Sequence, residues 1–296
     1  MKNFICELKN ALKSKLFYLN CIIPTVLSLI LAFHSIQSFK INSVPVLNEI
    51  QSGNIHFNPM IQNYSIFNLW IGATNENIIK TILFYAFPLV AAIAYGWSFR
   101  NDREVLYSIG KKEYKKYCMS RYFTIFITSG LTLAIPLIVN LLTILLFVPV
   151  IYPDSAYDIY FGIFSYHFAS DLFYSAPFLH TGIFILFAFV YSGLIGCLSY
   201  AFYTVYNNRI IAIIITYIIF FIINWKNDDI SSLITTSNEL TVSPILFLSS
   251  ARLAFLNVNV YMIEIIILFI YSFTTVFFSN MNVLQNKESK GNKDEK

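Results

Sequence analysis

The sequence predicts an all-α polytopic membrane protein, and its composition and its hydrophobic pattern both lead to that prediction. Of its 296 residues, 57% are hydrophobic and 12% are charged, whereas a typical soluble domain carries about 25% charged residues. Twenty-nine Phe and twenty Tyr supply aromatic side chains suited to membrane interfaces. Six apolar segments approach the length of about 20 residues that crosses the hydrocarbon core. We therefore expect residues 1–296 to form a single transmembrane domain.

The six predicted transmembrane helices follow one another along the chain. They cover residues 16–34, 78–99, a stretch within 122–151, 179–203, 210–225 and 258–279. The fifth segment is short, so its ends are the least well defined. The third is long and contains Pro136 and Pro149, which favours a kink or a tilt.

The distribution of basic residues predicts the orientation of these helices. Sixteen of the twenty Lys and Arg lie before the first segment, between the second and third, after the fourth, or in the tail. Because cytoplasmic loops are enriched in Lys and Arg, both termini are expected in the cytoplasm. Residues 35–77 and 153–178 then form extracytoplasmic loops, and the polar residues 280–296 form a disordered cytoplasmic tail.

The N-terminal residues 1–15 have the pattern of an amphipathic helix. Apolar side chains fall on one helical face and Lys2, Glu7, Lys9 and Lys13 on the other. A helix of this kind lies along a membrane surface with its lysines near anionic headgroups. The alternative is a merely positive flank of the first span.

The cytoplasmic loop at residues 99–121 contains "FRNDREVLYSIGKKEYKKY" and seven of the basic residues. Asn101 or Asp102 can cap a helix start, and Glu104 stands at the matching capping-box position. Gly110 is placed to end that helix in the left-handed conformation. The loop therefore predicts a short helix at residues 102–109, whereas an ordinary positive loop would explain the lysines alone.

Two further segments carry structure without spanning the membrane. The apolar patch in "SPILFLSS" before the sixth span is too short to cross, which predicts a re-entrant or interfacial element. Residues 157–178 are crowded with aromatic side chains and predict one or two helices at the outer interface. Those aromatic residues could form an interfacial belt or line a substrate vestibule.

The sequence contains few residues that indicate a catalytic, nucleotide-binding or metal-binding site. "SIGKKEY" lacks the glycine-rich lead-in and the Ser or Thr of a Walker A loop. The four Cys and four His match no metal or redox spacing. Inside the predicted spans the one clear ionisable residue is Glu264, which either pairs for structural reasons or lines a pathway.

At this point the chain resembles the membrane subunit of ABC-2 type ABC transporters. That family has a cytoplasmic elbow helix, six spans, a coupling helix between spans two and three, and a re-entrant element before the last span. The elbow helix resembles residues 1–15, the coupling helix residues 102–109 and the re-entrant element "SPILFL". The loops between spans one and two and between spans three and four are larger than in the family. The resemblance implies that the following residues contact a separate ATP-binding subunit: Asp102, Arg103, Glu104, Leu106, Tyr107, Ile109 and Gly110.

The resemblance also implies a location, partners and a function. This chain would hold no cofactor, because ATP and Mg²⁺ would be bound by the partner ATPase. It would pair with a second copy or a paralogue in the bacterial cytoplasmic membrane, in contact with lipids and not with nucleic acid. It would export an amphipathic or apolar cargo, with an antimicrobial or signalling peptide as the first choice. The alternatives are a polytopic membrane enzyme acting on lipid or peptide, and a sensor or accessory subunit that transports nothing.

Overall fold

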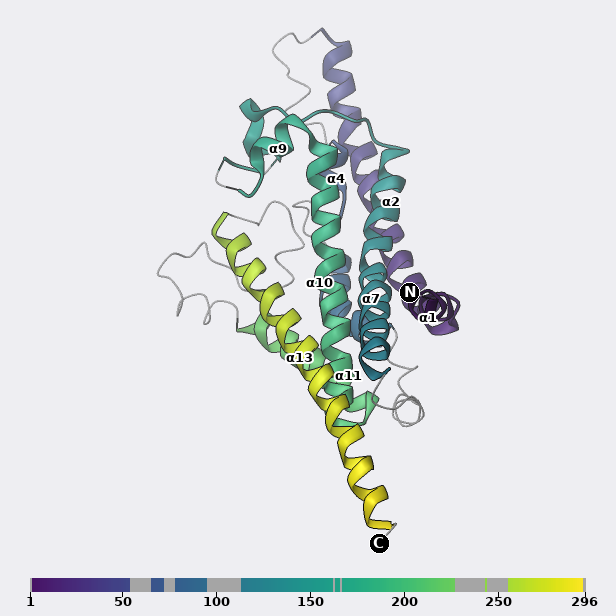
Figure 1. The fold of residues 1–296 in the computed structure, drawn as a ribbon. Helices are drawn as coiled ribbons and strands as arrows, with labels where there is room; N and C mark the ends of the chain where they lie inside the picture. Colours follow the sequence, from purple (N-terminus) through teal and green to yellow (C-terminus); the bar gives the residue numbers. More distant parts are fainter. Residues whose placement is uncertain are drawn as a thin grey trace.

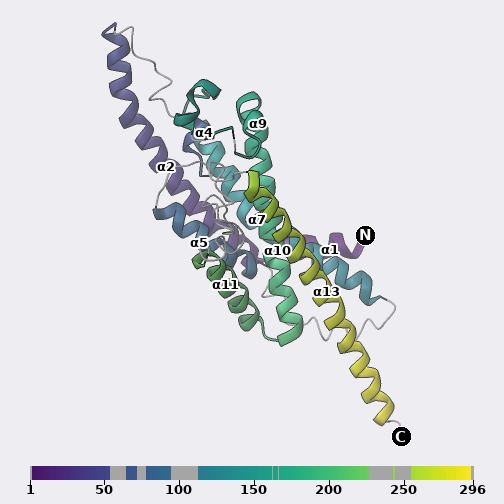
Figure 2. The same ribbon diagram turned by 90° about the vertical axis from the view of Figure 1, so that its left-hand side faces the viewer.

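The computed structural model describes residues 2–53, 65–71, 78–94, 113–161, 163–165, 167–226, 243 and 255–294. Every regular element in these ranges is a helix, which confirms the predicted all-helical class. In chain order the elements are α1 (Lys2–Leu12), α2 (Lys15–Gln51), α4 (Ile66–Leu69), α5 (Ile78–Ile93), α7 (Tyr114–Leu145), the 3-10 helix η2 (Ser155–Tyr157), α8 (Asp158–Phe161), α9 (Ser170–Ser175), α10 (Pro177–Tyr206), α11 (Arg209–Trp225) and α13 (Phe255–Asp294). The long helices form an elongated bundle, and α1 lies across it (Figures 1 and 2).

Four helices of the described part are long and apolar enough to cross a membrane. They are α2 over Lys15–Pro45, α7, α10, and α13 over Val258–Met281. The second and fifth predicted spans correspond to α5 and α11, which have only 16 and 17 residues. Figures 1 and 2 show α11 ending well short of the end of the bundle that holds α9. The transmembrane character is therefore supported by four helices, and six crossings stay a prediction.

Two helices extend further than the hydrophobic pattern indicated. α2 continues to Gln51 with Pro45 inside it, where the sequence predicted a loop from residue 35. α13 continues to Asp294, where a disordered tail was predicted. The physical reason is that a helix already formed over its apolar part adds each further turn at little cost. Glu, Gln and Lys in the α13 extension are also good helix formers.

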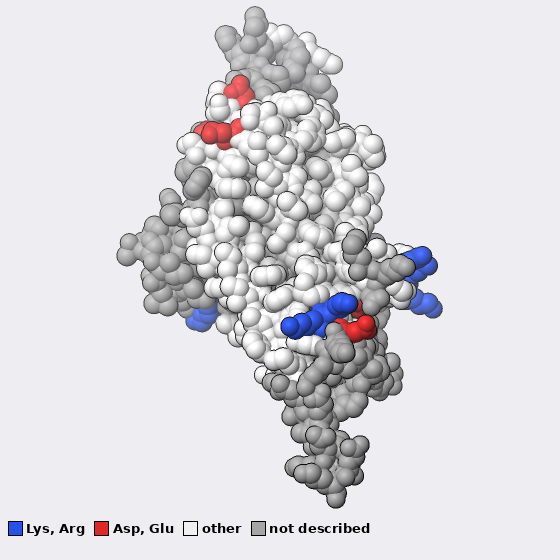
Figure 3. Space-filling model, viewed as in Figure 1, with Lys and Arg blue, Asp and Glu red and all other residues white. Residues whose placement is uncertain are grey.

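Charged residues are distributed unevenly between the two ends of the bundle, which we call basal and distal. The basal end holds α1, the N-terminus of α7, the turn between α10 and α11, and the C-terminus of α13 (Figure 1). The distal end holds α4, η2, α8 and α9. On the face seen in Figure 3, every Lys and Arg that is drawn lies in the basal half, and acidic side chains also occur at the distal end. This asymmetry follows the charge bias of the sequence.

The helix α10 is the centre of the bundle and packs on α7, α13, α11, α5 and α9. Every residue from Tyr191 to Thr204 is buried. A helix buried on all its faces must be apolar or small all round. Ser192, Gly193, Gly196 and Ala201 meet that need, because each occupies little volume between neighbouring helices.

The contact between α7 and α10 is the most extensive in the fold and depends on glycine. A Cβ at Gly193 would lie 2.7 Å from the carbonyl oxygen of Phe126, and one at Gly130 would lie 2.8 Å from that of Phe189. At Gly196 it would lie 2.4 Å from the Cβ of Ser129. Small residues of this kind let two backbones approach closely in a membrane.

A buried polar group joins α2, α7 and the segment 65–71. The amide nitrogen of Asn140 donates to the carbonyl of Ser28 at 2.7 Å, and its oxygen accepts from the backbone N–H of Ile71 at 3.0 Å. Residues 65–71 are all buried, although the sequence placed them in a polar extracytoplasmic loop. Their burial arises because "SIFNLWI" is itself apolar and finds its partners on distant helices.

The glycine contact yields a test of the central packing. Gly196→Ala should lower the midpoint of thermal unfolding in detergent, because overpacking costs about 1–3 kcal/mol. The matched control is Gly182→Ala, also on α10, where an added Cβ meets nothing within 4 Å. The control should be as stable as the parent or more so, since Ala is the better helix former. Equal midpoints for the two variants would contradict the close approach.

Candidate functional site

The residues expected to contact an ATPase lie outside the described residues. Asp102, Arg103, Glu104, Leu106, Tyr107, Ile109 and Gly110 all fall in the range 95–112 between α5 and α7. The predicted re-entrant segment lies outside them too, except for Ser243. The structure does describe α7, which begins at Tyr114 inside the predicted loop 99–121, and the contacts of that helix.

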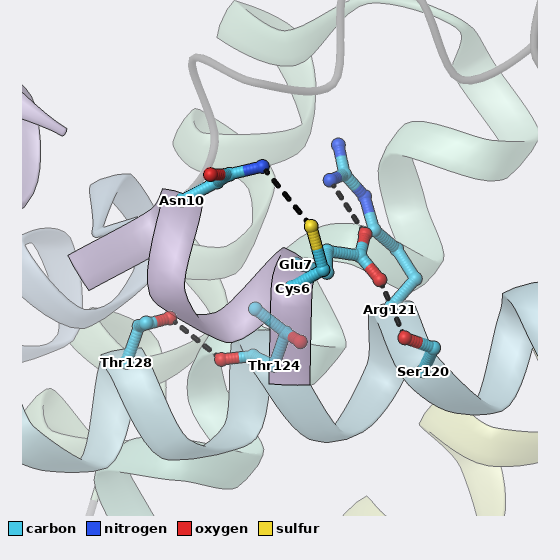
Figure 4. Close-up of polar contacts among 7 residues, drawn as sticks. All are labelled: Cys6, Glu7, Asn10, Ser120, Arg121, Thr124 and Thr128. Atoms are coloured by element: carbon cyan, nitrogen blue, oxygen red, sulfur yellow. Dashed lines mark hydrogen bonds and ion pairs between the residues drawn. The ribbon is translucent and has the colours of Figure 1, made fainter. Parts of the chain in front are cut away.

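An ion pair joins α1 to α7 close to the end of that loop. Arg121 Nη1 lies 2.9 Å from Glu7 Oε1, and the Ser120 hydroxyl donates to Glu7 Oε2 at 2.6 Å (Figure 4). The Arg121 and Glu7 side chains are 8% and 16% exposed. The Glu7 carboxylate thus receives one hydrogen bond on each oxygen from adjacent residues of α7. We call this arrangement the α1–α7 contact.

Local sequence positions α1 for this contact. The Ser14 hydroxyl accepts from the backbone N–H of Phe17 at 3.2 Å, which caps the start of α2 and separates it from α1. The chain can therefore change direction at Lys13 and Ser14, and α1 crosses the axis of the bundle (Figures 1 and 2). Ala11 on α1 is 1% exposed, and its small side chain allows α1 to pack closely.

Sequence reasoning missed the α1–α7 contact. It placed Glu7 on the polar face of an amphipathic helix and counted Arg121 only as one of many basic residues. Two signals were present: Glu7 is the only acidic residue before Glu49, and Arg121 lies further along the apolar helix α7 than the lysines before it. An arginine in such a position needs an acceptor, because a buried unpaired charge is costly.

Glu264 on α13 is bound to the central helix. The Tyr191 hydroxyl donates to Glu264 Oε2 at 2.8 Å. The Tyr191 and Tyr261 rings stack with centroids 5.4 Å apart, and the Tyr261 hydroxyl donates to the Phe187 carbonyl at 2.6 Å. The structure therefore provides a structural partner for Glu264 on α10.

The aromatic segment at the distal end packs against itself and against the buried segment 65–71. Phe173 meets Phe67 and His180 edge to face, with centroids 6.2 and 5.1 Å apart. The Tyr174 hydroxyl donates to the Ile163 carbonyl at 2.5 Å. Burial, helped by Asp158 and Asp154, raises the pKa of Tyr174 to about 12, so this hydroxyl keeps its proton at neutral pH. The rings thus form a packed cap over the bundle.

The described residues hold no cluster of three or more His, Cys, Asp or Glu side chains that could bind a metal ion. The cysteines Cys6, Cys21, Cys118 and Cys197 are free thiols, and all but Cys6 are buried. The polar groups described above join helices to one another.

Comparison with known proteins finds no match to this chain among protein families, characterised proteins or solved structures. Its function must therefore be argued from its own residues.

The α1–α7 contact predicts a local effect of a single substitution. Glu7→Ala should speed amide hydrogen exchange in α1 by about tenfold or more, since hydrogen bonds to charged groups contribute about 1.5–3 kcal/mol. Glu7→Gln should have a smaller effect, because its amide oxygen still accepts a hydrogen bond. Lys9→Ala is the control, since Lys9 is exposed on the same helix. Unchanged exchange in Glu7→Ala would mean that other contacts hold α1.

Glu264 gives a second test, built on its hydrogen bond from Tyr191. Glu264→Leu leaves the buried Tyr191 hydroxyl without this acceptor and should cost about 1–3 kcal/mol of stability. Glu264→Gln should be mild, because its amide oxygen can still accept, and Tyr191→Phe should recover much of the loss in the Leu variant. Thermal unfolding in detergent measures all three. A Gln variant as unstable as the Leu variant would show that the charge itself is needed.

Proposed function

We propose that this chain is the membrane-spanning subunit of an ATP-driven exporter of the ABC-2 type, powered by a separate ATP-binding subunit. The observation that carries the proposal is the α1–α7 contact. It attaches a transverse N-terminal helix to α7, which begins at Tyr114 within the basic segment 99–121. Four long apolar helices and the basic basal end support the same proposal.

The contact suggests how force from a partner would enter the membrane domain. An ATPase bound to residues 102–109 would pull on α7, whose first helical residue is Tyr114. Because Ser120 and Arg121 hold Glu7, α1 would move together with the basal part of α7. The close packing at Gly193 and Gly196 would pass the movement to α10 as a rigid-body shift.

The distribution of charge and of exposed apolar surface suggests the orientation, the oligomeric partner and the cargo of the proposed exporter. Both termini would lie in the cytoplasm of a bacterial cell, with the basal end inside and the aromatic cap outside. Only 17% of the residues in the most apolar part of the α13 span are buried within this chain. A second copy or a paralogue would therefore find a large apolar face there. Few charges inside the bundle favour an amphipathic or apolar cargo, with a peptide as first choice.

Two other classes of function remain as competing proposals. A membrane enzyme needs acidic, basic or nucleophilic side chains gathered at one depth, and the described polar groups instead join helices in separate places. A sensor or accessory subunit would share the fold but drive no transport. ATP hydrolysis stimulated by cargo in a purified complex separates an exporter from both alternatives.

The proposed coupling residues give the decisive experiment. Glu104→Lys and Gly110→Val should leave membrane insertion intact but abolish co-purification of the proposed ATP-binding subunit. The first introduces a charge where like-charge contacts cost several kcal/mol, and the second opposes a left-handed turn.

The matched control is Glu113→Lys, which makes the same charge change at an exposed residue before α7. This variant should still co-purify with the ATPase, and the complex in nanodiscs should hydrolyse ATP at the rate of the parent complex. If Glu104→Lys and Gly110→Val also retain both, residues 102–109 are only a charged loop and the exporter proposal loses its support.

A further inference from the structure

A pocket opens in the angle between α1 and α7 at the basal end. Its volume is about 570 Å³. The lining residues are Phe4 from α1 and, from α7, Lys115, Lys116, Met119, Ser120, Phe123 and Ile127. Ser120 also donates to Glu7, so the pocket lies next to the α1–α7 contact, whose hydrogen bonds Figure 4 shows. Phe4 brings α1 into the lining, so the shape of the pocket depends on how α1 lies against α7.

The lining separates into a charged mouth and an apolar stripe. Lys115, Met119, Phe123 and Ile127 recur every four residues and thus lie along one face of α7. Met119 and Phe123 are 38% and 41% exposed, so this apolar face of α7 is open to a lipid chain. The charge is at the start of the helix, and the apolar stripe leads toward its middle.

The two lysines are available to an anion. Both are exposed, and neither forms an ion pair within the part of the chain that the structure describes. Glu7 on the neighbouring helix is already engaged by Arg121 and Ser120. Two ammonium groups on neighbouring residues can approach one phosphate from adjacent positions, and basic pockets at this level of a membrane protein bind anionic headgroups.

The length of the stripe distinguishes a lipid from a soluble anion. From Lys115 to Ile127 the helix rises about 18 Å, at about 1.5 Å per residue. One leaflet of the hydrocarbon core is about 15 Å thick, half of about 30 Å. A molecule with an anionic head at the lysines and an acyl chain along Met119, Phe123 and Ile127 would thus cover the whole stripe, whereas a soluble anion would use only its mouth.

We propose that the pocket between α1 and α7 binds one anionic phospholipid of the basal leaflet, with its phosphate at Lys115 and Lys116 and an acyl chain along Met119, Phe123 and Ile127. The lipid lies beside the α1–α7 contact and holds α1 in its crossed position. The inference rests on the membrane-spanning character of α7 and does not depend on an ATPase partner.

Native mass spectrometry of the full-length protein in detergent tests the site. Phosphatidylglycerol, phosphatidylcholine and glycerol phosphate are the three probes. We expect one tightly bound phosphatidylglycerol and much weaker binding of phosphatidylcholine. Lys115→Gln with Lys116→Gln should raise the apparent Kd for phosphatidylglycerol by about fivefold per lysine, since each basic residue near an anionic surface contributes about 1 kcal/mol.

The control is Lys9→Gln with Lys13→Gln, which removes two exposed basal lysines that do not line the pocket. It should change the Kd by less than about twofold, because those lysines lie outside the site. A second variant, Met119→Trp, fills the apolar stripe and keeps both lysines. It therefore still tests the site if the double glutamine variant does not fold. It should weaken binding of phosphatidylglycerol strongly.

Four results would overturn the proposal. Equal binding of phosphatidylcholine would remove the role of charge. An equal loss of phosphatidylglycerol affinity in the Lys9 and Lys13 control would mean that the lipid is attracted to the whole basic end and not to a specific site. Displacement of the lipid by equimolar glycerol phosphate would show that only the headgroup is recognised. Unchanged binding in Met119→Trp would place the acyl chain elsewhere.

Discussion

The close approach of α7 and α10 is the contact on which the rest of the structure depends. In a membrane, helices gain little from the hydrophobic effect, so packing and interhelical hydrogen bonds must hold them together. Gly130, Gly193 and Gly196 remove the side chains that would keep these two backbones apart. The Ser192 hydroxyl then reaches the Ser129 carbonyl on the other helix at 2.8 Å. α2 packs on this pair from the α7 side, and α11 and α13 pack on it from the α10 side.

Several outer elements are also attached to this pair by polar side chains. Arg121 holds α1, Asn140 holds α2 and the segment 65–71, and Tyr191 holds α13 through Glu264. A polar group left unpaired in hydrocarbon costs several kcal/mol, so such contacts select one arrangement of helices over others that would pack equally well. The few polar residues within the apolar helices therefore specify the arrangement, and the apolar residues supply the packing area.

The basal half of α7 is where the two proposals meet. Within its first four turns it carries the exposed lysines and apolar stripe of the pocket and the Ser120–Arg121 contact with α1. A phospholipid in the pocket would stabilise α1 against α7, and a partner acting on the loop before Tyr114 would move them together. Lipid composition would then influence how readily the basal end moves, because a bound ligand stabilises the conformation that it prefers.

The sequence by itself determined the class of the protein and the position of its apolar helices, because hydrophobicity and helical periodicity are local properties of a segment. It also determined which end of the bundle is basic. Only the tertiary structure decided that Glu7 meets Arg121, that Asn140 meets Ser28 and Ile71, and that residues 65–71 are buried. These outcomes depend on residues far apart in the chain, which the packing of whole helices brings together, so no single segment could name the partners.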